Sequence, residues 1–149
     1  MLKKIGKSWL VVCILIALLV MGADLKEKTG VSLLSSTTVA MGTNNTKANL
    51  YTVPAGKSCI VTKVIIHSLS GAVACGNDND FGDGASADTW KTAVNLSTLD
   101  ATDDYWVVSN DDALVEAVFD AVDVFGIMTD VGSSASAVNA TVDVFGYLY

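Results

Sequence analysis

The hydrophobic and polar positions of residues 50–69 (LYTVPAGKSCIVTKVIIHSL) follow the pattern of two β-strands joined by a turn. Pro54 suits the second position of a tight turn at residues 53–56, and Gly56 suits its last position. A period of two with β-branched residues is typical of a half-buried strand. We therefore predict a β-hairpin formed by residues 50–53 and 59–69, in which one face of the second strand carries Ile60, Thr62, Val64 and Ile66.

Strand-like composition recurs on both sides of this hairpin, and glycine, asparagine and aspartate separate the strands. Residues 31–38 predict a first strand after a linker, and residues 90–99 and 105–109 predict two more. The most polar stretch, residues 76–88 (GNDNDFGDGASAD), predicts a loop that Phe81 anchors to the core.

Residues 111–122 (DDALVEAVFDAV) fit two different elements. A helix would carry its apolar residues on one face, with Asn110 as its N-cap and two aspartates in its first turn. A pair of short strands that turn near Asp120 and Ala121 fits the same residues. Because the surrounding pattern is all-β, we favour the strands.

The end of the chain contains an internal echo. Residues 122–128 (VDVFGIM) recur twenty positions later as residues 142–148 (VDVFGYL). A single echo is too little for a repeat architecture, which needs at least three units. We interpret the two segments as neighbouring strands that fill equivalent core positions, with Val122 and Val124 corresponding to Val142 and Val144. The last strand is then part of the core.

Short strands at this spacing predict an all-β fold, a single antiparallel β-sandwich or jelly-roll-like domain. We divide the chain into an N-terminal hydrophobic helix at residues 1–23, a linker with the first strand at residues 24–49, and the sandwich at residues 50–149. The first strand lies behind a linker, so it could pair at its exposed edge with the sheet of another subunit.

The first 23 residues combine a basic start at Lys3, Lys4 and Lys7 with an apolar stretch at residues 10–23. Fourteen apolar residues are fewer than the roughly 20 that span a bilayer, which favours a cleaved signal peptide and an exported protein. A retained membrane anchor and a helix packed inside an assembly are the alternatives. Membrane contact is expected only through residues 9–23, if they are not cleaved.

The charge distribution excludes one class of partner. All sixteen acidic residues follow Ala23, but only six lysines do, which leaves residues 24–149 with a net charge of −10. The chain contains no arginine. Because nucleic-acid binding needs clustered lysine or arginine to neutralise phosphates, we expect no nucleic-acid partner.

Two sets of residues are candidates for a structural or metal site. Asp78, Asp80 and Asp83 alternate in a glycine-rich stretch and could supply carboxylate oxygens to Ca²⁺, although their spacing departs from the helix–loop–helix calcium pattern. A solvated acidic loop is the alternative. Cys59 and Cys75 could form a disulfide in an exported domain, or remain two buried thiols. We expect no cofactor other than this candidate calcium ion.

Catalytic residues are not apparent in the pattern. His67 is the single histidine, and no G-x-S-x-G nucleophile motif accompanies it, so we expect a histidine on a sheet surface or edge and no enzyme. Trp90, Tyr105 and Trp106 could form a platform for a sugar, although aromatic residues at strand starts are more typical of cores and interfaces.

Three segments of the chain resemble those of a known protein family. The segments LYTVPAGKSCIVTKVII, DFGDGASADTW and TVDVFGYLY are similar to those of small β-sandwich structural proteins of tailed phages and other virions. The resemblance covers about two thirds of the chain, from Leu50 to the end. It implies assembly and surface roles and brings no catalytic residues. The apolar N-terminus departs from that family and keeps an exported surface protein open.

Three functional hypotheses follow. The first is a non-enzymatic structural subunit that self-assembles on a virion or cell surface. The second is an extracellular filament or pilus subunit whose N-terminal helix packs in the filament core. The third is a secreted calcium- or glycan-binding β-sandwich module. The expected location is outside the cell, on its surface or on a virion surface.

Overall fold

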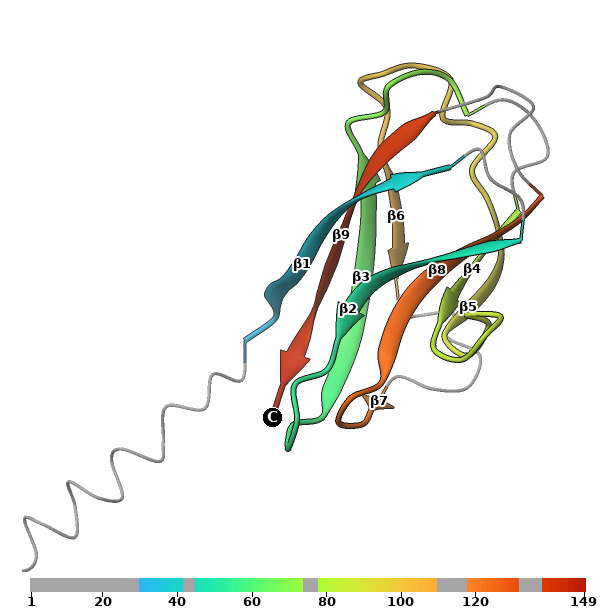
Figure 1. Cartoon of the computed structure of the whole chain (residues 1–149). Coiled ribbons are helices and arrows are strands. Elements are labelled where there is room, and N and C mark those ends of the chain that lie inside the picture. Colours follow the sequence, from blue (N-terminus) through green and yellow to red (C-terminus); the bar gives the residue numbers. More distant parts are fainter. Residues whose placement is uncertain (1–29, 42–44, 74–77, 110–117, 132–137) are drawn as a thin grey trace, which may run out of the picture.

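The computed structural model describes residues 30–41, 45–73, 78–109, 118–131 and 138–149 (Figure 1). This part of the chain contains strands and no helix. The strands are β1 (Ser32–Ala40), β2 (Thr46–Thr52), β3 (Cys59–His67), β4 (Asp78–Gly82), β5 (Lys91–Asn95), β6 (Trp106–Ser109), β7 (Val118–Phe119), β8 (Val124–Val131) and β9 (Asn139–Leu148).

The strands form two antiparallel sheets. Sheet A has the order β1-β9-β3-β6, with β7 pairing to the beginning of β3, and sheet B has the order β2-β8-β4-β5. Successive strands repeatedly cross from one sheet to the other, and this order is that of an eight-stranded jelly roll with β7 added. The all-β prediction with antiparallel sheets is confirmed.

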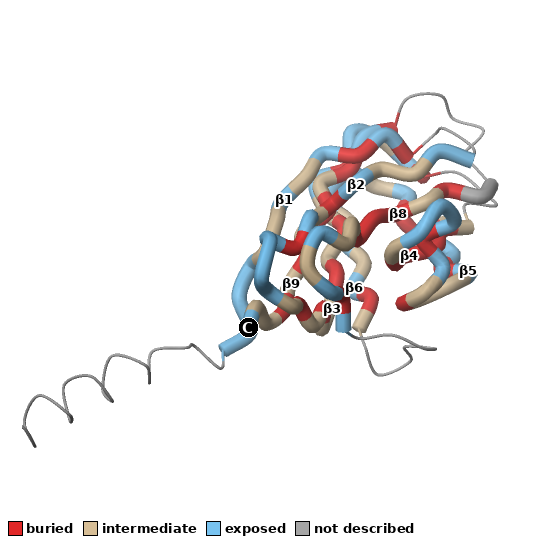
Figure 2. The backbone as a smooth tube through the Cα atoms, turned by 60° about the horizontal axis from the view of Figure 1, so that its bottom comes forward, coloured by how far each residue is buried: buried red, intermediate tan, exposed pale blue. Residues whose placement is uncertain are grey.

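One hydrophobic core lies between the two sheets. Side chains from strands of both sheets contribute to it, and buried positions alternate with more exposed ones along most strands (Figure 2). Its largest members form a row of edge-to-face aromatic pairs, with centroid separations of 6.3 Å for Phe81–Trp90, 5.5 Å for Trp90–Phe125 and 5.2 Å for Phe119–Phe125. Because β4, β7 and β8 supply these rings together with the loop before β5, the row joins sheet A to sheet B.

The predicted hairpin at residues 50–69 is wrong in its pairing. Its two strands exist, but β2 lies in sheet B and β3 in sheet A, so the connection crosses between the sheets. The turn is shifted by one residue, because the Lys57 N–H donates to the carbonyl oxygen of Pro54 at 3.1 Å. Gly56 is therefore the third residue of the turn, where its φ of 75° is suited to glycine.

The predicted alternation along β3 also breaks. Cys59 and Val61 face the core at the beginning of the strand, whereas Val64 and Ile66 face it at the end. A register shift between Val61 and Lys63, opposite β9, moves the alternation by one residue. This β-bulge reverses which half of the side chains points inward, and a residue pattern alone does not show it.

The internal echo takes two different places. Segment 122–128 belongs mainly to β8 of sheet B and segment 142–148 to β9 of sheet A, so the predicted neighbouring strands are in fact in opposite sheets. In β9 the core residues are Val142 and Val144, but in β8 they are Phe125 and Ile127. The predicted equivalence of core positions is therefore wrong.

The phenylalanine–glycine pair of the echo nevertheless has one common role. Strand β2 has a register shift opposite Phe125 and Gly126, and β3 has one opposite Phe145 and Gly146. A Cβ atom at Gly126 would lie 2.7 Å from the carbonyl oxygen of Ala48, and one at Gly146 would lie 2.1 Å from that of Ile60. Each glycine thus admits the backbone of a bulged neighbouring strand.

The predicted loop at residues 76–88 is partly a strand. Residues 78–82 form β4 between β8 and β5, and the loop begins after it. The strand is stabilised because Asn79 and Phe81 are buried between the sheets, where the Asn79 side-chain oxygen accepts a hydrogen bond from Thr129 Oγ1 at 3.0 Å. The prediction that Phe81 anchors this stretch to the core is confirmed.

Several predictions fall on residues outside the described ranges. These are the hydrophobic segment at residues 1–23, Cys75, and residues 110–117 of the ambiguous stretch. Residues 118–119 do form a strand, and a turn follows at residues 120–123, where the Asp123 N–H donates to the carbonyl oxygen of Asp120 at 3.0 Å. Within the described ranges, no helix is long and apolar enough to cross a membrane.

Candidate functional site

The three aspartates of the predicted calcium site have separate partners. Asp80 Oδ1 accepts a hydrogen bond from the Ala93 N–H at 2.8 Å, and the Asp83 carboxylate accepts one from Thr89 Oγ1 at 2.5 Å. Asp78 is half-buried at the beginning of β4, opposite Asn95. The described residues contain no group of three acidic, cysteine or histidine side chains that could hold a metal ion. Calcium binding stays a prediction, with its residues placed around the β4–β5 connection.

The acidic stretch at residues 100–104 (DATDD) includes a carboxylate that stabilises a turn. Asp104 Oδ2 accepts hydrogen bonds from the N–H groups of Asp100 and Ala101, both at 2.9 Å. A short polar side chain that accepts backbone N–H groups in this way organises a loop locally. The hydrogen bonds of Asp104 therefore give its carboxylate a structural role in this turn.

Cys59 is fully buried on the inner side of β3, and no disulfide joins it to another of the described residues. Its predicted partner Cys75 lies outside the described residues, so the pairing stays a prediction. Burial disfavours the thiolate and raises the pKa of the Cys59 thiol from 9.0 to about 11. A thiol of this kind is expected to act as a small core residue.

We expect this thiol to make the domain less stable in alkali. The thiol ionises near pH 9 in the unfolded chain and near pH 11 in the folded one. Its contribution to the free energy of unfolding is therefore complete below pH 9 and is lost as the pH rises to about 11. Two pKa units correspond to roughly 3 kcal/mol. Urea unfolding between pH 8 and 11 should show that the free energy of unfolding falls less for Cys59→Ala than for the wild type. An equal fall in the free energy of unfolding of the two proteins would contradict a raised pKa of the Cys59 thiol.

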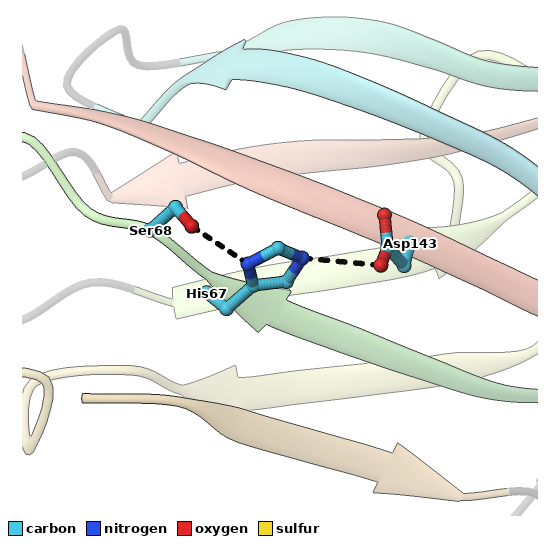
Figure 3. A network of polar contacts seen from close by, with 3 residues as sticks. All are labelled: His67, Ser68 and Asp143. Carbon is cyan, nitrogen blue, oxygen red and sulfur yellow. Dashed lines mark hydrogen bonds and ion pairs between the residues drawn. The ribbon is translucent and has the colours of Figure 1, made fainter. Parts of the chain in front are cut away.

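His67 lies at the end of β3 and contacts two polar side chains (Figure 3). Its Nε2 is 3.1 Å from Asp143 Oδ2 on β9, and its Nδ1 is 2.8 Å from Ser68 Oγ. The side chain is 35% exposed, which fits the predicted surface histidine. Asp143 was not foreseen as its partner, because 76 residues separate the two and only the β3–β9 register brings them together.

These contacts have the order of a serine–histidine–aspartate relay with the two imidazole nitrogens exchanged. A serine nucleophile also needs hydrogen-bond donors placed for a developing oxyanion and a cleft that holds the substrate. Ser68 is exposed and directly follows the histidine in the chain, with a φ of 52°. We therefore assign the contact between His67 and Asp143 a structural role, in which it joins the two central strands of sheet A.

The predicted aromatic platform does not form. Trp90 is fully buried in the core, whereas Tyr105 is 70% exposed before β6 and Trp106 is partly buried against the core. The alternative of a core role is correct for Trp90. Its ring contributes to the aromatic row and is not available to a sugar.

The outer side of sheet A carries an unusual number of apolar side chains. Ile65 pairs with Val107, Phe145 with Leu33, and Ile60 with both Tyr147 and Val118. The strand neighbours of Ile60, Ile65 and Phe145 are buried, so these three side chains point outward. Residues that pair across a sheet share a face, so the four side chains paired with them point outward as well. We call this set the sheet A surface: Leu33, Ile60, Ile65, Val107, Val118, Phe145 and Tyr147.

Charged groups on the sheet A surface are few. Lys63 lies with its Nζ 4.8 Å from the centre of the Phe145 ring, and His67 and Asp143 form the pair described above. On the outer side of sheet B, a single row across the strands joins Lys47, Met128 and Asp80. Lys47 Nζ also donates to the carbonyl oxygens of Gly84 and Val124.

Large exposed apolar side chains are concentrated in the same sheet. Of the seven in the described residues, six belong to strands of sheet A or to residues next to them, and only Val122 lies elsewhere, in the turn before β8. These six are Val31, Leu33, Tyr105, Val107, Val118 and Tyr149. Sequence reasoning missed this surface because the β-bulges decide which side chains point outward.

A groove of about 350 Å³ lies where the two sheets end side by side at β5 and β6. Trp106, Val94 and Val108 contribute apolar atoms to it, and Lys91 and Asn95 contribute polar ones. The opposite side of the sandwich is formed by the edge strands β1 and β2. On that side Thr37 Oγ1 of β1 donates to the carbonyl oxygen of Leu50 in β2 at 3.4 Å, so the hollowed side is the one at β5 and β6.

The fold and its exposed sheet define an all-β sandwich with a candidate interaction surface. No protein-family model matches the chain, and no curated protein matches it. It is similar to a chain of the capsid of cyanophage Pam1, with 16% identity over 79% of this chain and 84% of that chain and a TM-score of 0.49. It is also similar to a chain of the acid-stable capsid of Helicobacter pylori bacteriophage KHP30, with 13% identity over 79% and 88% and a TM-score of 0.47.

Proposed function

We propose that the protein is a non-enzymatic structural subunit that self-assembles through sheet A on a virion or cell surface. The observation that carries this proposal is the concentration of exposed apolar side chains in one sheet. Six of the seven in the described residues belong to sheet A or its flanks. Exposed apolar side chains that gather on one sheet in this way are typical of a protein–protein contact.

The edges of sheet A support the same proposal. Both β1 and β6 are terminal strands of the sheet, and neither contains a charged residue or a proline. Natural proteins usually protect exposed strand edges with such residues, because an open edge pairs readily with another chain. Edges without this protection are expected in a subunit whose edges become covered. The sequence resemblance to virion β-sandwich proteins favours a virion surface as the place of assembly.

A matched pair of substitutions tests this proposal. Val107→Glu adds a carboxylate to the sheet A surface, whereas Val122→Glu makes the same change at the exposed valine outside it. Val107 is 47% exposed and Val122 67%, so neither change should unfold the domain. We expect Val107→Glu to lower the mass of the assembly, because burying an unpaired charge in a contact is costly.

Light scattering after size-exclusion chromatography measures the effect, and circular dichroism checks that both variants are folded. Val122→Glu is expected to assemble as the wild type does. Equal masses for all three proteins would argue against an assembly contact through sheet A.

A further inference from the structure

We infer that copies of this chain join head to tail, with the β1 edge of one copy pairing with the β6 edge of the next and extending sheet A. This inference rests on the proposed function, which it deepens by naming the two contact edges and the partner. The partner is a second copy of the chain. The contact is heterologous, because two different edges meet.

The first observation is the difference between the edges of the two sheets. Strand β1 reads SLLSSTTVA and β6 reads WVVS, and neither contains a charge. The edges of sheet B are protected, since β2 carries Lys47 and β5 carries Lys91. In β5, Ala93 also has a φ of 56°, which interrupts regular strand geometry. Among the described strands, the uncharged edges are therefore the two edges of sheet A, and β1 pairs in regular register from Ser35 to Ala40, beyond its register shift between Leu33 and Ser35.

The second observation is strand direction. Strand β1 is antiparallel to β9, β9 to β3, and β3 to β6, so β1 and β6 run in opposite directions. A copy displaced sideways without being turned over therefore brings its β6 antiparallel to the first copy's β1. Antiparallel pairing is the more stable arrangement, and it continues the pattern of the whole sheet.

The third observation is that apolar side chains accompany both edges. Val31 and Leu33 are exposed at the beginning of β1, and Tyr105 and Val107 are exposed at β6. The groove of about 350 Å³ opens beside the β6 edge, with the partly buried Trp106 in its lining. A second copy placed there would cover the apolar side chains of both edges and close the hollowed side of the sandwich.

Charge explains why a contact between two copies lies at these edges. The chain has a net charge of −7, so most surfaces of two copies repel each other. The uncharged edges of sheet A are free of this repulsion. Isologous contacts of β1 with β1 and of β6 with β6 would also avoid it, but a variant with one blocked edge would then still form a dimer through its other edge. The head-to-tail contact covers both edges.

A mixing experiment tests the inference. Leu33→Glu blocks the β1 edge and Val107→Glu blocks the β6 edge, and glutamate is chosen because an added negative charge increases repulsion between acidic copies. For each variant alone, we expect the association constant between copies to fall by more than about tenfold, so that the variant is monomeric. Each variant keeps one intact edge. Equal amounts of the two should therefore form a dimer of twice the monomer mass and nothing larger, measured by light scattering.

The outcomes separate the inference from the proposed function. A wild-type protein that is monomeric would overturn both. A wild-type assembly with a mixture that stays monomeric, or with single variants that still assemble, would overturn the head-to-tail contact alone and leave the structural role standing. Val122→Glu mixed with either variant is the control. Its two intact edges allow it to keep associating with itself and with either variant, so that mixture should contain species larger than a dimer.

Discussion

Replacing Gly146 with alanine is expected to cost the domain more than about 3 kcal/mol, enough to unfold a marginally stable protein. The added Cβ would lie 2.1 Å from the carbonyl oxygen of Ile60 and 2.9 Å from the Leu34 side chain. Gly146 lies on β9, between β3 and β1, and pairs with both neighbours. Neither strand can move away without breaking its hydrogen bonds to β9. The clash can therefore be relaxed only at a large cost in stability.

Gly71→Ala is the matched control, because a Cβ at Gly71 would meet its nearest atom, in Val138, at an ordinary distance of 3.8 Å. Thermal unfolding followed by circular dichroism compares the two variants with the wild type. We expect Gly71→Ala to melt close to the wild type and Gly146→Ala to be unfolded or to melt far lower. A Gly146→Ala protein that melts within a few degrees of the wild type would show that the close approach of β3 is not required.

Phe125→Ala should cost about 3–5 kcal/mol, whereas the same change at Phe145 should cost far less. Both phenylalanines occupy the same position of the internal echo. Phe125 is fully buried and packs edge-to-face against Trp90 and Phe119, so its removal leaves a cavity in the aromatic row. Phe145 is on the outer side of β9, where it loses mainly its contact with Lys63.

The free energies of unfolding in urea measure this difference directly. Equal losses for Phe125→Ala and Phe145→Ala would mean that the two segments fill equivalent core positions after all. The comparison therefore tests which face each strand of the echo presents to the core. It also supplies a folded variant, Phe145→Ala, with a smaller sheet A surface.

Much of the fold could be predicted from local patterns. Alternation, turn residues and composition were enough to predict an all-β chain, the strands around β1, β3, β5 and β6, and the core role of Phe81. Pairing between strands could not be predicted in this way. Residues 50–53 and 59–69 have the pattern of a hairpin, but the chain crosses to the other sheet after Val53 because each strand finds its hydrogen-bonding partners far away in sequence, in β8 and β9.

The β-bulges account for most of the remaining errors. A single extra residue near Thr62 reverses the inward and outward positions of β3, and a similar shift in β2 lies opposite Gly126. The pattern of residue types is the same whether or not a bulge is present. The sheet A surface depends on which side chains of each strand point outward. It can therefore be recognised only once the strand register is known.

The candidate site residues illustrate the same limit. Asp78, Asp80 and Asp83 were singled out by their spacing, but Asp80 and Asp83 are engaged with Ala93 and Thr89, residues that follow them in the chain. His67 was judged to be a surface residue from its place on a strand, and that judgement was sound. Its partner Asp143 could not be named, because the pairing of β3 with β9 determines it.

The central claim is that this protein works as an assembled subunit, and its mass in solution tests that claim most directly. We would measure light scattering of the wild-type protein over a range of concentrations without detergent, with the intact mass of the chain determined on the same sample. The account predicts a mass above that of one chain that rises with concentration, with ordered particles or filaments in negative stain. A mass equal to one chain at every concentration would contradict it.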